Sequence, residues 1–553
     1  MKKIMIIIIL FLPSLAFGVT HINSLPFTCS TPGETYVLTK SLSTPGTAIV
    51  ISAHDVTLDL NGHTITFGTG NKKCNGIETT WNKKNIEIFG GKVIHGGVGN
   101  PPACNGVFIQ ESSTNVRIHD LEIFVKSRAT GDPHEKTRGV SMSRARNPKV
   151  YHCVVDNQAS EVVNRHSIPA VGISINLEAN STSCEVYGND VKTTHMGIAV
   201  GNGWRAYGPL GNKVYDNKIT VDQVAVNAYG LLLGSMSQLE AYNNNINGMT
   251  ARGGRGMIFS YLENFDIHHN TVNTREARTA ESFQTHGIRS RWGVRYGKIR
   301  DNRVNVFAGQ TAGYGNAIGI YVTASVYSDN PTKDVGVEIS NNAIKAITYD
   351  LSKIACGIYF ELVDKNSQFL IKENTISTNH LGIKFSASWN QSLHCEDLKL
   401  YRTKIIKLAE NSSKFQTYEV AGGKGQVKDV HLVDTMYENG ASEDSISFNH
   451  ELSFGEITHV STSKVLVKGG DGSPVPGATV KLTNRSGERV FDGKTNGSGE
   501  CVSEVPYKKH LKSGGKTDFN PFSVEAEYES KKVSKKEFIT NDKKNFVIQL
   551  PNN

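Results

Sequence analysis

A glycine followed by an aliphatic residue recurs along the chain at intervals of 25 to 38 residues. Most of these pairs open a run in which apolar and polar residues alternate, as in residues 172–175 and 319–322. Alternation with a period of two predicts a β-strand, and we expect the glycine to supply the tight turn into that strand. The repeated glycines are Gly76, Gly106, Gly139, Gly172, Gly197, Gly230, Gly256, Gly287, Gly319, Gly357 and Gly382.

An asparagine lies 14 to 23 residues after each of seven of these glycines, in the pattern apolar-x-x-Asn-x-apolar. If the repeats stack, one asparagine per repeat can form a ladder in which each amide hydrogen-bonds to the next. One isolated asparagine would be a catalytic candidate, whereas seven at one repeat position indicate a structural role. The seven are Asn189, Asn217, Asn244, Asn270, Asn302, Asn342 and Asn374.

Two or three short strands per repeat, separated by polar segments of variable length, are typical of the coil of a parallel β-helix. No segment shows the sustained 3.6-residue period of a helical repeat. Over residues 22–455 the chain resembles the pectate-lyase-like superfamily of right-handed parallel β-helices, and residues 57–65 resemble the first coil of its exported members. The resemblance implies an all-β solenoid of about a dozen coils, which we assign to residues 19–460. It implies no single activity, because that superfamily includes lyases, hydrolases, epimerases and proteins without catalytic activity.

A different pattern begins near Val465. Alternating strands joined by glycine-rich turns, including residues 471–482 and 496–499, predict a small antiparallel β-sandwich over residues 461–553. The motif resembles carboxypeptidase-regulatory-like domains, which implies an appended module. Four lysine pairs in this part predict either a solvated, edge-protecting face or an anion-binding surface; they are Lys508-Lys509, Lys531-Lys532, Lys535-Lys536 and Lys543-Lys544.

The first 18 residues have the pattern of a secretory signal peptide. Lys2 and Lys3 precede the apolar stretch 4–12, and residues 16–18 form a small-x-small cleavage site. No later stretch approaches the ~20 apolar residues that a membrane helix needs. We therefore expect a secreted, periplasmic or cell-surface protein. Its net charge of +8 favours an acidic partner, which outside a cell indicates an anionic polysaccharide rather than nucleic acid.

The residues two and four positions after each repeated glycine are expected to point outward and to form one continuous surface across the coils. Along this surface Arg289 and Arg291 lie between small residues on one side and tyrosines on the other. Residues 252–303 carry nine arginines and one lysine against five carboxylates, which predicts a site for a carboxylated or sulfated glycan. The predicted substrate-binding residues are Arg255, Trp204, Trp292, Tyr321, Tyr359, Glu361 and Lys384.

A lyase acting on a uronate chain needs a cation to neutralise the sugar carboxylate and a base to remove the adjacent proton. Arg289 and Arg291 suit the first role, and His286, Tyr261 or a neighbouring arginine suits the second. Residues 291–302 resemble the arginine-containing coil of the alginate-lyase and chondroitin-lyase B family. That family also has a lysine base one coil earlier, where this chain has Ser260. A polysaccharide lyase is our leading hypothesis.

Two rival functions stay open. The same arginines and aromatic residues could bind a glycan without turnover, as in a surface or structural protein. Asp132-Pro133-His134 matches the core of the alginate C5-epimerase motif. Clustered aspartates of the polygalacturonase type are absent from the sequence, and calcium stays open as a cofactor because carboxylates from neighbouring coils can converge without a sequence motif.

Cys74 and Cys104 each lie two residues before a repeated glycine. They should therefore occupy equivalent positions in adjacent coils, with Cα atoms ~4.8 Å apart, which is within disulfide range. We expect a disulfide between them. Cys153 stands at the asparagine position of its repeat and should be a buried small apolar residue.

Overall fold

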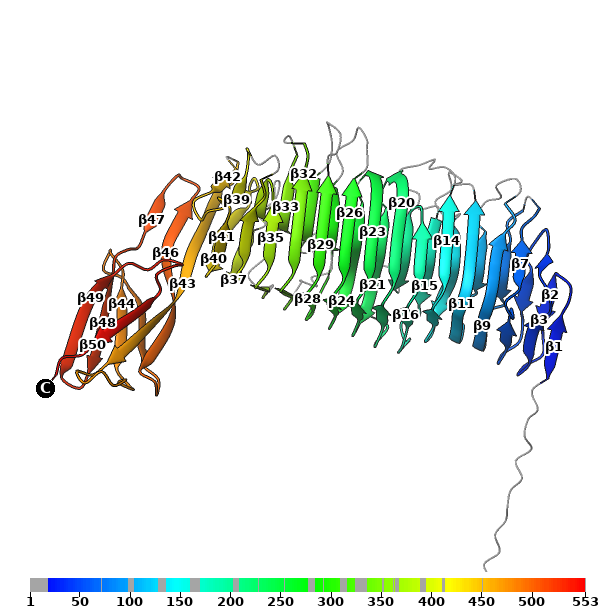
Figure 1. Ribbon diagram of the computed structural model, residues 1–553, viewed down its shortest axis with the longest axis horizontal. Helices are drawn as coiled ribbons and strands as arrows, with labels where there is room; N and C mark the ends of the chain where they lie inside the picture. Colours follow the sequence, from blue (N-terminus) through cyan, green and yellow to red (C-terminus); the bar gives the residue numbers. More distant parts are fainter. Residues whose placement is uncertain are drawn as a thin grey trace, which may run out of the picture.

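The protein is an elongated, slightly curved stack of β-strands with a smaller β-domain at its C-terminal end, as seen in the computed structural model (Figure 1). The structure describes residues 18–70, 72–97, 104–127, 136–159, 170–201, 208–226, 228–252, 254–276, 284–291, 293–308, 316–323, 336–350, 353–361, 363, 368–387, 394–409, 413–449 and 451–552. All regular elements within these ranges are β-strands, which confirms the predicted all-β fold class. A search of the same ranges for a helix able to cross a membrane finds none. The expected signal segment lies outside them, apart from Gly18.

Three parallel sheets run along the length of the stack, one strand of each per coil. We name the first the glycine sheet, because its strands carry the repeated glycines. Its 15 strands are β2 (Phe27–Cys29), β5 (Ile49–Ile51), β8 (Asn75–Thr79), β10 (Asn105–Ile109), β12 (Thr137–Ala145), β15 (Ala170–Leu177), β18 (Met196–Gly201), β21 (Tyr229–Ser237), β24 (Arg255–Glu263), β27 (Gln284–Ser290), β30 (Asn316–Thr323), β33 (Ala355–Glu361), β36 (Leu381–Ser386), β39 (Gln416–Ala421) and β42 (Ile446–Phe448).

The second and third sheets meet at the asparagine turns, and two long strands pass through both sheets. The second sheet contains β1 (Val19–Ile22), β3 (Thr35–Leu38), β6 (Thr57–Asp59), β9 (Lys84–His95), β11 (Thr114–Ser127), β13 (Lys149–Tyr151), β16 (Glu185–Tyr187), β19 (Lys213–Tyr215), β22 (Glu240–Tyr242), β25 (Asp266–His268), β28 (Lys298–Arg300), β31 (Glu338–Ser340), β34 (Leu370–Lys372), β37 (Cys395–Tyr401), β40 (Gln426–Val433) and β43 (Phe454–Lys468). The third sheet shares β9 and β11 and adds β4 (Leu42–Ser43), β7 (Thr64–Phe67), β14 (Val154–Ala159), β17 (Asp190–Thr193), β20 (Lys218–Val226), β23 (Asn245–Arg252), β26 (Thr271–Glu276), β29 (Arg303–Ala308), β32 (Ala343–Thr348), β35 (Thr375–Thr378), β38 (Lys404–Lys407) and β41 (Met436–Glu438).

The repeated glycines are required for packing and not for a turn, which corrects the sequence-based expectation. None of the eleven has a positive φ. A Cβ atom at Gly230 would lie 2.2 Å from Cγ2 of Ile246 and 2.5 Å from the carbonyl oxygen of Gly256. The aliphatic side chains of the third sheet therefore pack directly on the glycine backbone, and the next coil closes over it. The same contacts recur at the other repeated glycines.

The asparagine ladder is confirmed. All seven side chains are buried, and Nδ2 of each of the first six donates a hydrogen bond of 2.9 to 3.0 Å to Oδ1 of the next asparagine, from Asn189 to Asn374. Each Nδ2 also donates to a carbonyl oxygen of the preceding coil, as Asn244 does to Val214 at 2.8 Å. The ladder thus satisfies polar backbone atoms that the turn would otherwise leave buried without partners. Cys153 precedes the ladder, is buried, and donates its backbone N–H to Oδ1 of Asn189 at 3.0 Å.

The last coil and the C-terminal domain share one long strand, β43. β43 pairs in parallel with β40 along its first part, while β50 (Asn545–Gln549) pairs in parallel with its last part and β46 (Glu500–Leu511) pairs antiparallel along most of its length. The expected boundary between residues 460 and 461 therefore falls inside β43. The remaining strands of the domain are β44 (Thr479–Thr483), β45 (Arg489–Lys494), β47 (Lys516–Asp518), β48 (Phe522–Tyr528) and β49 (Lys531–Glu537).

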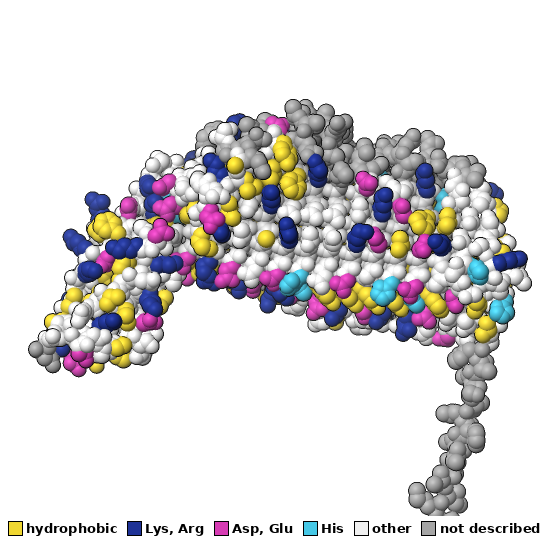
Figure 2. Space-filling model, viewed as in Figure 1, with side chains coloured by type: hydrophobic (Ala, Val, Ile, Leu, Met, Phe, Trp, Pro, Cys, Tyr) yellow, Lys and Arg dark blue, Asp and Glu magenta, His cyan; other side chains and the backbone are white. Residues whose placement is uncertain are grey.

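Six of the eight paired lysines of this domain form ion pairs with carboxylates, which favours the structural interpretation of the pairs over an anion-binding surface. Lys508 and Lys509 bind Glu443 and Glu456 of the last coils, and Lys544 binds Asp434 at 2.9 Å. Lys532, Lys535 and Lys543 pair within the domain. Charges of both signs are interspersed on the face shown in Figure 2. The net charge of +8 therefore does not form one cationic patch there.

Adding one methyl group at a repeated glycine should destabilise the stack. We expect Gly230→Ala to lower the free energy of unfolding by about 3 kcal/mol or more, because both Ile246 and a backbone carbonyl would have to move. Gly248, on β23, is the matched control, since the atom nearest to its added Cβ would be 3.7 Å away. Urea unfolding of both variants measures the difference, and equal stabilities would contradict the packing role.

Candidate functional site

The outward side chains of the glycine sheet form a single row along the stack. Strand register aligns Leu232 with Ile258, Ile258 with Arg289, and Arg289 with Tyr321. The row continues through Tyr359, Lys384 and Glu419, so residues about 30 positions apart in the chain become neighbours. The outward positions are nevertheless largely covered, since Ile258 and Tyr321 are only 1% and 5% exposed.

Three arginines cluster in the middle of this sheet. Arg289 lies in the row, Arg291 two residues later, and Arg255 precedes the glycine of the neighbouring strand. Arg255 donates a hydrogen bond of 2.7 Å from Nη1 to the hydroxyl of Tyr229, and Cζ of Arg289 lies 4.8 Å from the ring centroid of Tyr321. The guanidinium groups of Arg255 and Arg289 are therefore each held by an aromatic neighbour.

The cluster is electrostatically unfavourable without a ligand. Burial, reinforced by the charge of Arg255, lowers the pKa of Arg289 to about 10. The pKa of Arg291 is lowered by the same two causes in the same order. Among the residues that the structure describes, Arg255 and Arg289 have no carboxylate within ion-pair distance. An anion placed between these guanidinium groups would relieve both the repulsion and the loss of hydration.

Aromatic rings continue the row beyond the arginines. His286 and Tyr321 stack with centroids 5.0 Å apart, and Tyr321 and Tyr359 stack at 4.8 Å. The hydroxyl of Tyr321 donates to Glu361, while Lys384 lies 5.3 Å from the Tyr359 ring and pairs with Glu419 at 2.8 Å. Burial, with the charge of Glu361, raises the pKa of both tyrosines, so their phenols stay protonated. The two tyrosines stack on each other, and Tyr321 also packs against Arg289. Their contact with substrate stays a prediction.

The two expected bases differ in accessibility. His286 is 1% exposed, and its Nε2 lies 3.1 Å from Oε1 of Gln284. Burial and the charges of Arg289 and Arg255 hold its pKa well below the usual value. His286 is thus a neutral group packed beneath the surface, which argues against the predicted role as a base that contacts substrate. Tyr261 is half-buried at a positive φ of 53° and lies near Arg291.

A groove of about 280 Å³ lies next to the arginine cluster on the same sheet. Gly201 and Gly234 provide its floor, because a larger residue at Gly201 would put a Cβ atom 2.0 Å from the Gly234 carbonyl oxygen. Lys136 lies at one end, and Ser260 lies at the end nearest the arginines. Apart from Lys136, the residues that line this groove are uncharged, and the groove adjoins the arginine cluster at Ser260.

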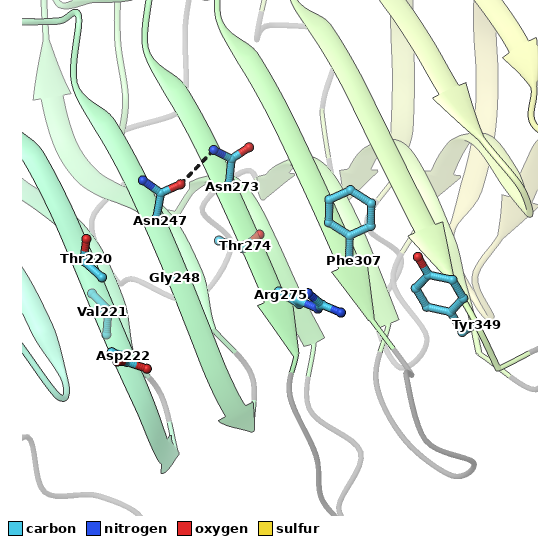
Figure 3. A pocket seen from close by; sticks show the side chains of 10 residues that line it. All are labelled: Thr220, Val221, Asp222, Asn247, Gly248, Asn273, Thr274, Arg275, Phe307 and Tyr349. Carbon is cyan, nitrogen blue, oxygen red and sulfur yellow. Dashed lines mark hydrogen bonds between the residues drawn. The ribbon is translucent and has the colours of Figure 1, made fainter.

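The sequence analysis missed a second pocket, of about 470 Å³, on the third sheet (Figure 3). Asn247 and Asn273 form its polar side and are joined by a hydrogen bond of 2.9 Å. Arg275 lies on the same strand as Asn273, and Phe307 and Tyr349 come from the following coils. A sequence signal existed, because an asparagine recurs three residues after three consecutive ladder asparagines, at Asn247, Asn273 and Asn305.

The other predicted sites are only partly placed. Trp204 and Trp292, and the epimerase-like Asp132 and His134, lie outside the described residues. The predicted disulfide is not formed in this structure, where the sulfur atoms of Cys74 and Cys104 lie 3.6 Å apart. In the part of the chain that the structure covers, no three carboxylates converge as a calcium site would require.

No family model matches the chain, and no curated protein matches its sequence. Solved structures resemble it in backbone only. The DFA-IIIase of Arthrobacter chlorophenolicus in complex with GF2 is 11% identical over 62% of this chain and 83% of its own, with a TM-score of 0.35. The A-module of an Azotobacter vinelandii mannuronan C-5 epimerase is 12% identical (72% and 91%, TM-score 0.32). The tailspike of E. coli bacteriophage HK620 in complex with a pentasaccharide is 11% identical (90% and 85%, TM-score 0.31). Similarity at this level carries no information about activity.

Replacing Arg289 by methionine should weaken anion binding without weakening the fold. A folded-state pKa below the usual value means that the protonated side chain costs stability at every pH below about 10, and this cost disappears in Arg289→Met. Losing a hydrogen-bonded charge costs about 1.5 to 3 kcal/mol of binding, or roughly 10- to 150-fold in affinity for a polyuronate.

Thermal unfolding and titration with oligosaccharides measure the two effects. Methionine preserves an apolar stem against Tyr321, so a lower melting temperature with unchanged affinity would show that Arg289 is structural.

Proposed function

We propose that this chain binds an acidic polysaccharide along the glycine sheet and cleaves it by β-elimination, as a polysaccharide lyase. The observation that supports the proposal is the arginine cluster, in which partly buried positive charges repel one another and lower the pKa of Arg289. A stack of coils does not need such a cluster, because the interior on the other side of these strands is already filled by apolar side chains. The repulsion between these charges and their loss of hydration are explained if the cluster exists to bind an anion.

In this proposal the uronate carboxylate binds Arg289 and Arg291 of one coil, and Arg255 strengthens the field from the adjacent coil. Neutralising the carboxylate makes the neighbouring C5 proton acidic. Tyr261, the half-buried side chain beside Arg291, takes that proton as its phenolate; the C4–O bond then breaks, a C4–C5 double bond forms, and Tyr261 returns the proton to the leaving oxygen. The groove beside Ser260 holds the neighbouring sugars of the chain.

Binding without turnover is the second candidate function. It is favoured by the burial of His286 and by Ser260, which stands where the resembled lyases have a lysine base. In both functions the protein acts outside the cytoplasm, which follows from the signal segment expected in residues 1–18.

Purified protein incubated with alginate, pectate, chondroitin sulfate and heparin separates the two functions. A lyase produces unsaturated ends that absorb ultraviolet light, whereas a binding protein retains the polymer and produces none. If no polyuronate produces an absorbance change and at least one is measurably retained, the protein is a binding protein and not a lyase.

Arg291→Ala should reduce turnover by roughly two to four powers of ten, the scale seen when one electrostatic stabiliser of a transition state is lost. Arg291→Lys should recover little, because a point charge does not reproduce bidentate geometry. Arg303→Ala, at an exposed arginine of the third sheet, is the matched control and should keep full activity. Initial rates of double-bond formation provide the measurement, and near-normal activity of Arg291→Ala would remove this residue from the mechanism.

A further inference from the structure

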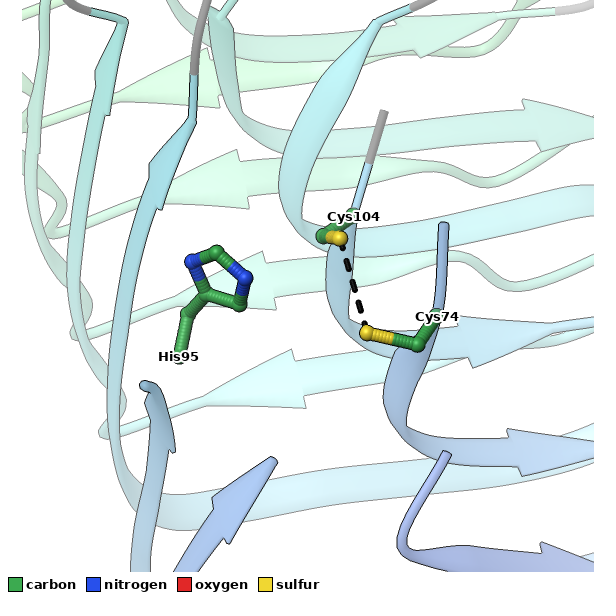
Figure 4. A group of neighbouring side chains, drawn as sticks. All are labelled: Cys74, His95 and Cys104. Carbon is green, nitrogen blue, oxygen red and sulfur yellow. Dashed lines mark hydrogen bonds between the residues drawn. The ribbon is translucent and has the colours of Figure 1, made fainter. Parts of the chain in front are cut away.

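The strongest unassigned feature of the molecule lies far from the arginine cluster, near the N-terminal end of the stack. Three side chains meet there from two adjacent coils: Cys74 just before β8, Cys104 just before β10, and His95 at the end of β9 (Figure 4). Strand register aligns Asn75 with Asn105, so the two cysteines occupy equivalent positions in successive coils. All three residues are buried, with exposed fractions of 4%, 0% and 6%.

The histidine is oriented as a ligand. Its Nδ1 lies 2.5 Å from the carbonyl oxygen of Lys126, which can only accept, so Nδ1 carries the proton of the neutral ring. Nε2 then presents a lone pair; it is buried and has no hydrogen-bond partner among the described residues. A histidine that binds a metal typically donates its other ring N–H to such a carbonyl, which fixes the tautomer and the ring orientation.

The positions of the two sulfur atoms also fit a bound metal ion. The two Sγ atoms are 3.6 Å apart, close to the ~3.8 Å that separates two thiolates bound at ~2.3 Å to a tetrahedral ion. A disulfide would need them at about 2.05 Å. The three donor atoms lie within 4.8 Å of one another, and Gly68 packs closely against the cluster, since a Cβ there would be 2.8 Å from Cys74 Sγ and 2.8 Å from His95 Nε2.

We propose that Cys74, His95 and Cys104 form a zinc site that clamps two consecutive coils near the N-terminal end of the β-helix. Two thiolates and one imidazole are donors that Zn²⁺ prefers, and they leave one position of the tetrahedron open. The burial of all three side chains favours a structural role, with a water molecule as the fourth ligand. A Cys74–Cys104 disulfide is the competing state of the same pair, because oxidised sulfurs cannot bind the ion as thiolates.

The test uses the full chain, reduced with a phosphine and freed of metal by a chelator. Titration with Zn²⁺ should show one ion bound per chain and a higher melting temperature. Co²⁺ can take the place of Zn²⁺, and its absorption spectrum depends on the ligands. It should therefore produce a thiolate-to-cobalt charge-transfer absorption. Cys104→Ser and His95→Gln should each weaken Zn²⁺ binding by roughly a hundredfold or more, and His95→Gln should also abolish the thermal shift.

Cys501→Ser, at a buried cysteine of the C-terminal domain, is the matched control and should bind Zn²⁺ as the wild type does. The proposal is overturned if the reduced wild type takes up no Zn²⁺, or if the cobalt complex lacks the thiolate band. Unchanged affinity in both ligand variants would place the ion elsewhere, for example at the adjacent His268 and His269 on the surface. Mass mapping that finds a Cys74–Cys104 bond, with no metal uptake after reduction, would identify the pair as a disulfide.

Discussion

Everything in this protein depends on how closely one coil can lie on the next. The glycine of each coil contacts an aliphatic side chain of the interior and the backbone of the following coil at distances that exclude a Cβ atom. At the turn between the second and third sheets, the amide group of each ladder asparagine hydrogen-bonds to the coil on either side of it. Tight apolar packing at one corner and complete hydrogen bonding at another together hold the coils in register.

That register creates the functional surface. Arg255, Arg289 and Arg291 meet only because strands β24 and β27 are neighbours with a defined alignment. The same alignment stacks His286, Tyr321 and Tyr359 into a rigid support beside them. The strand register fixes the backbone positions from which these three charges repel one another. The cluster is therefore held in a state that an anionic ligand would stabilise.

The C-terminal end of the stack is closed by the small domain. There β43 continues into that domain, and lysines of the domain pair with carboxylates of the last coils, as Lys508 does with Glu443 and Lys544 with Asp434. The last coil needs such contacts because it has a neighbouring coil on one side only. The proposed Cys74–His95–Cys104 site lies within the stack, at the third and fourth strands of the glycine sheet.

The sequence by itself determined the class of fold, the position of the ladder and the equivalence of Cys74 and Cys104, because each depends on a pattern that repeats locally along the chain. It also identified Arg289 and Arg291, since strand alternation predicts which side chains point outward. Only the tertiary structure decided what those outward residues do. Burial depends on how neighbouring coils and side chains cover a position, which is why Tyr321 and Tyr359 are buried although alternation predicts that they point outward. The reason for the glycines, the third-sheet pocket and the approach of His95 to the two cysteines likewise depend on contacts between residues distant in sequence, and no local pattern encodes those distances.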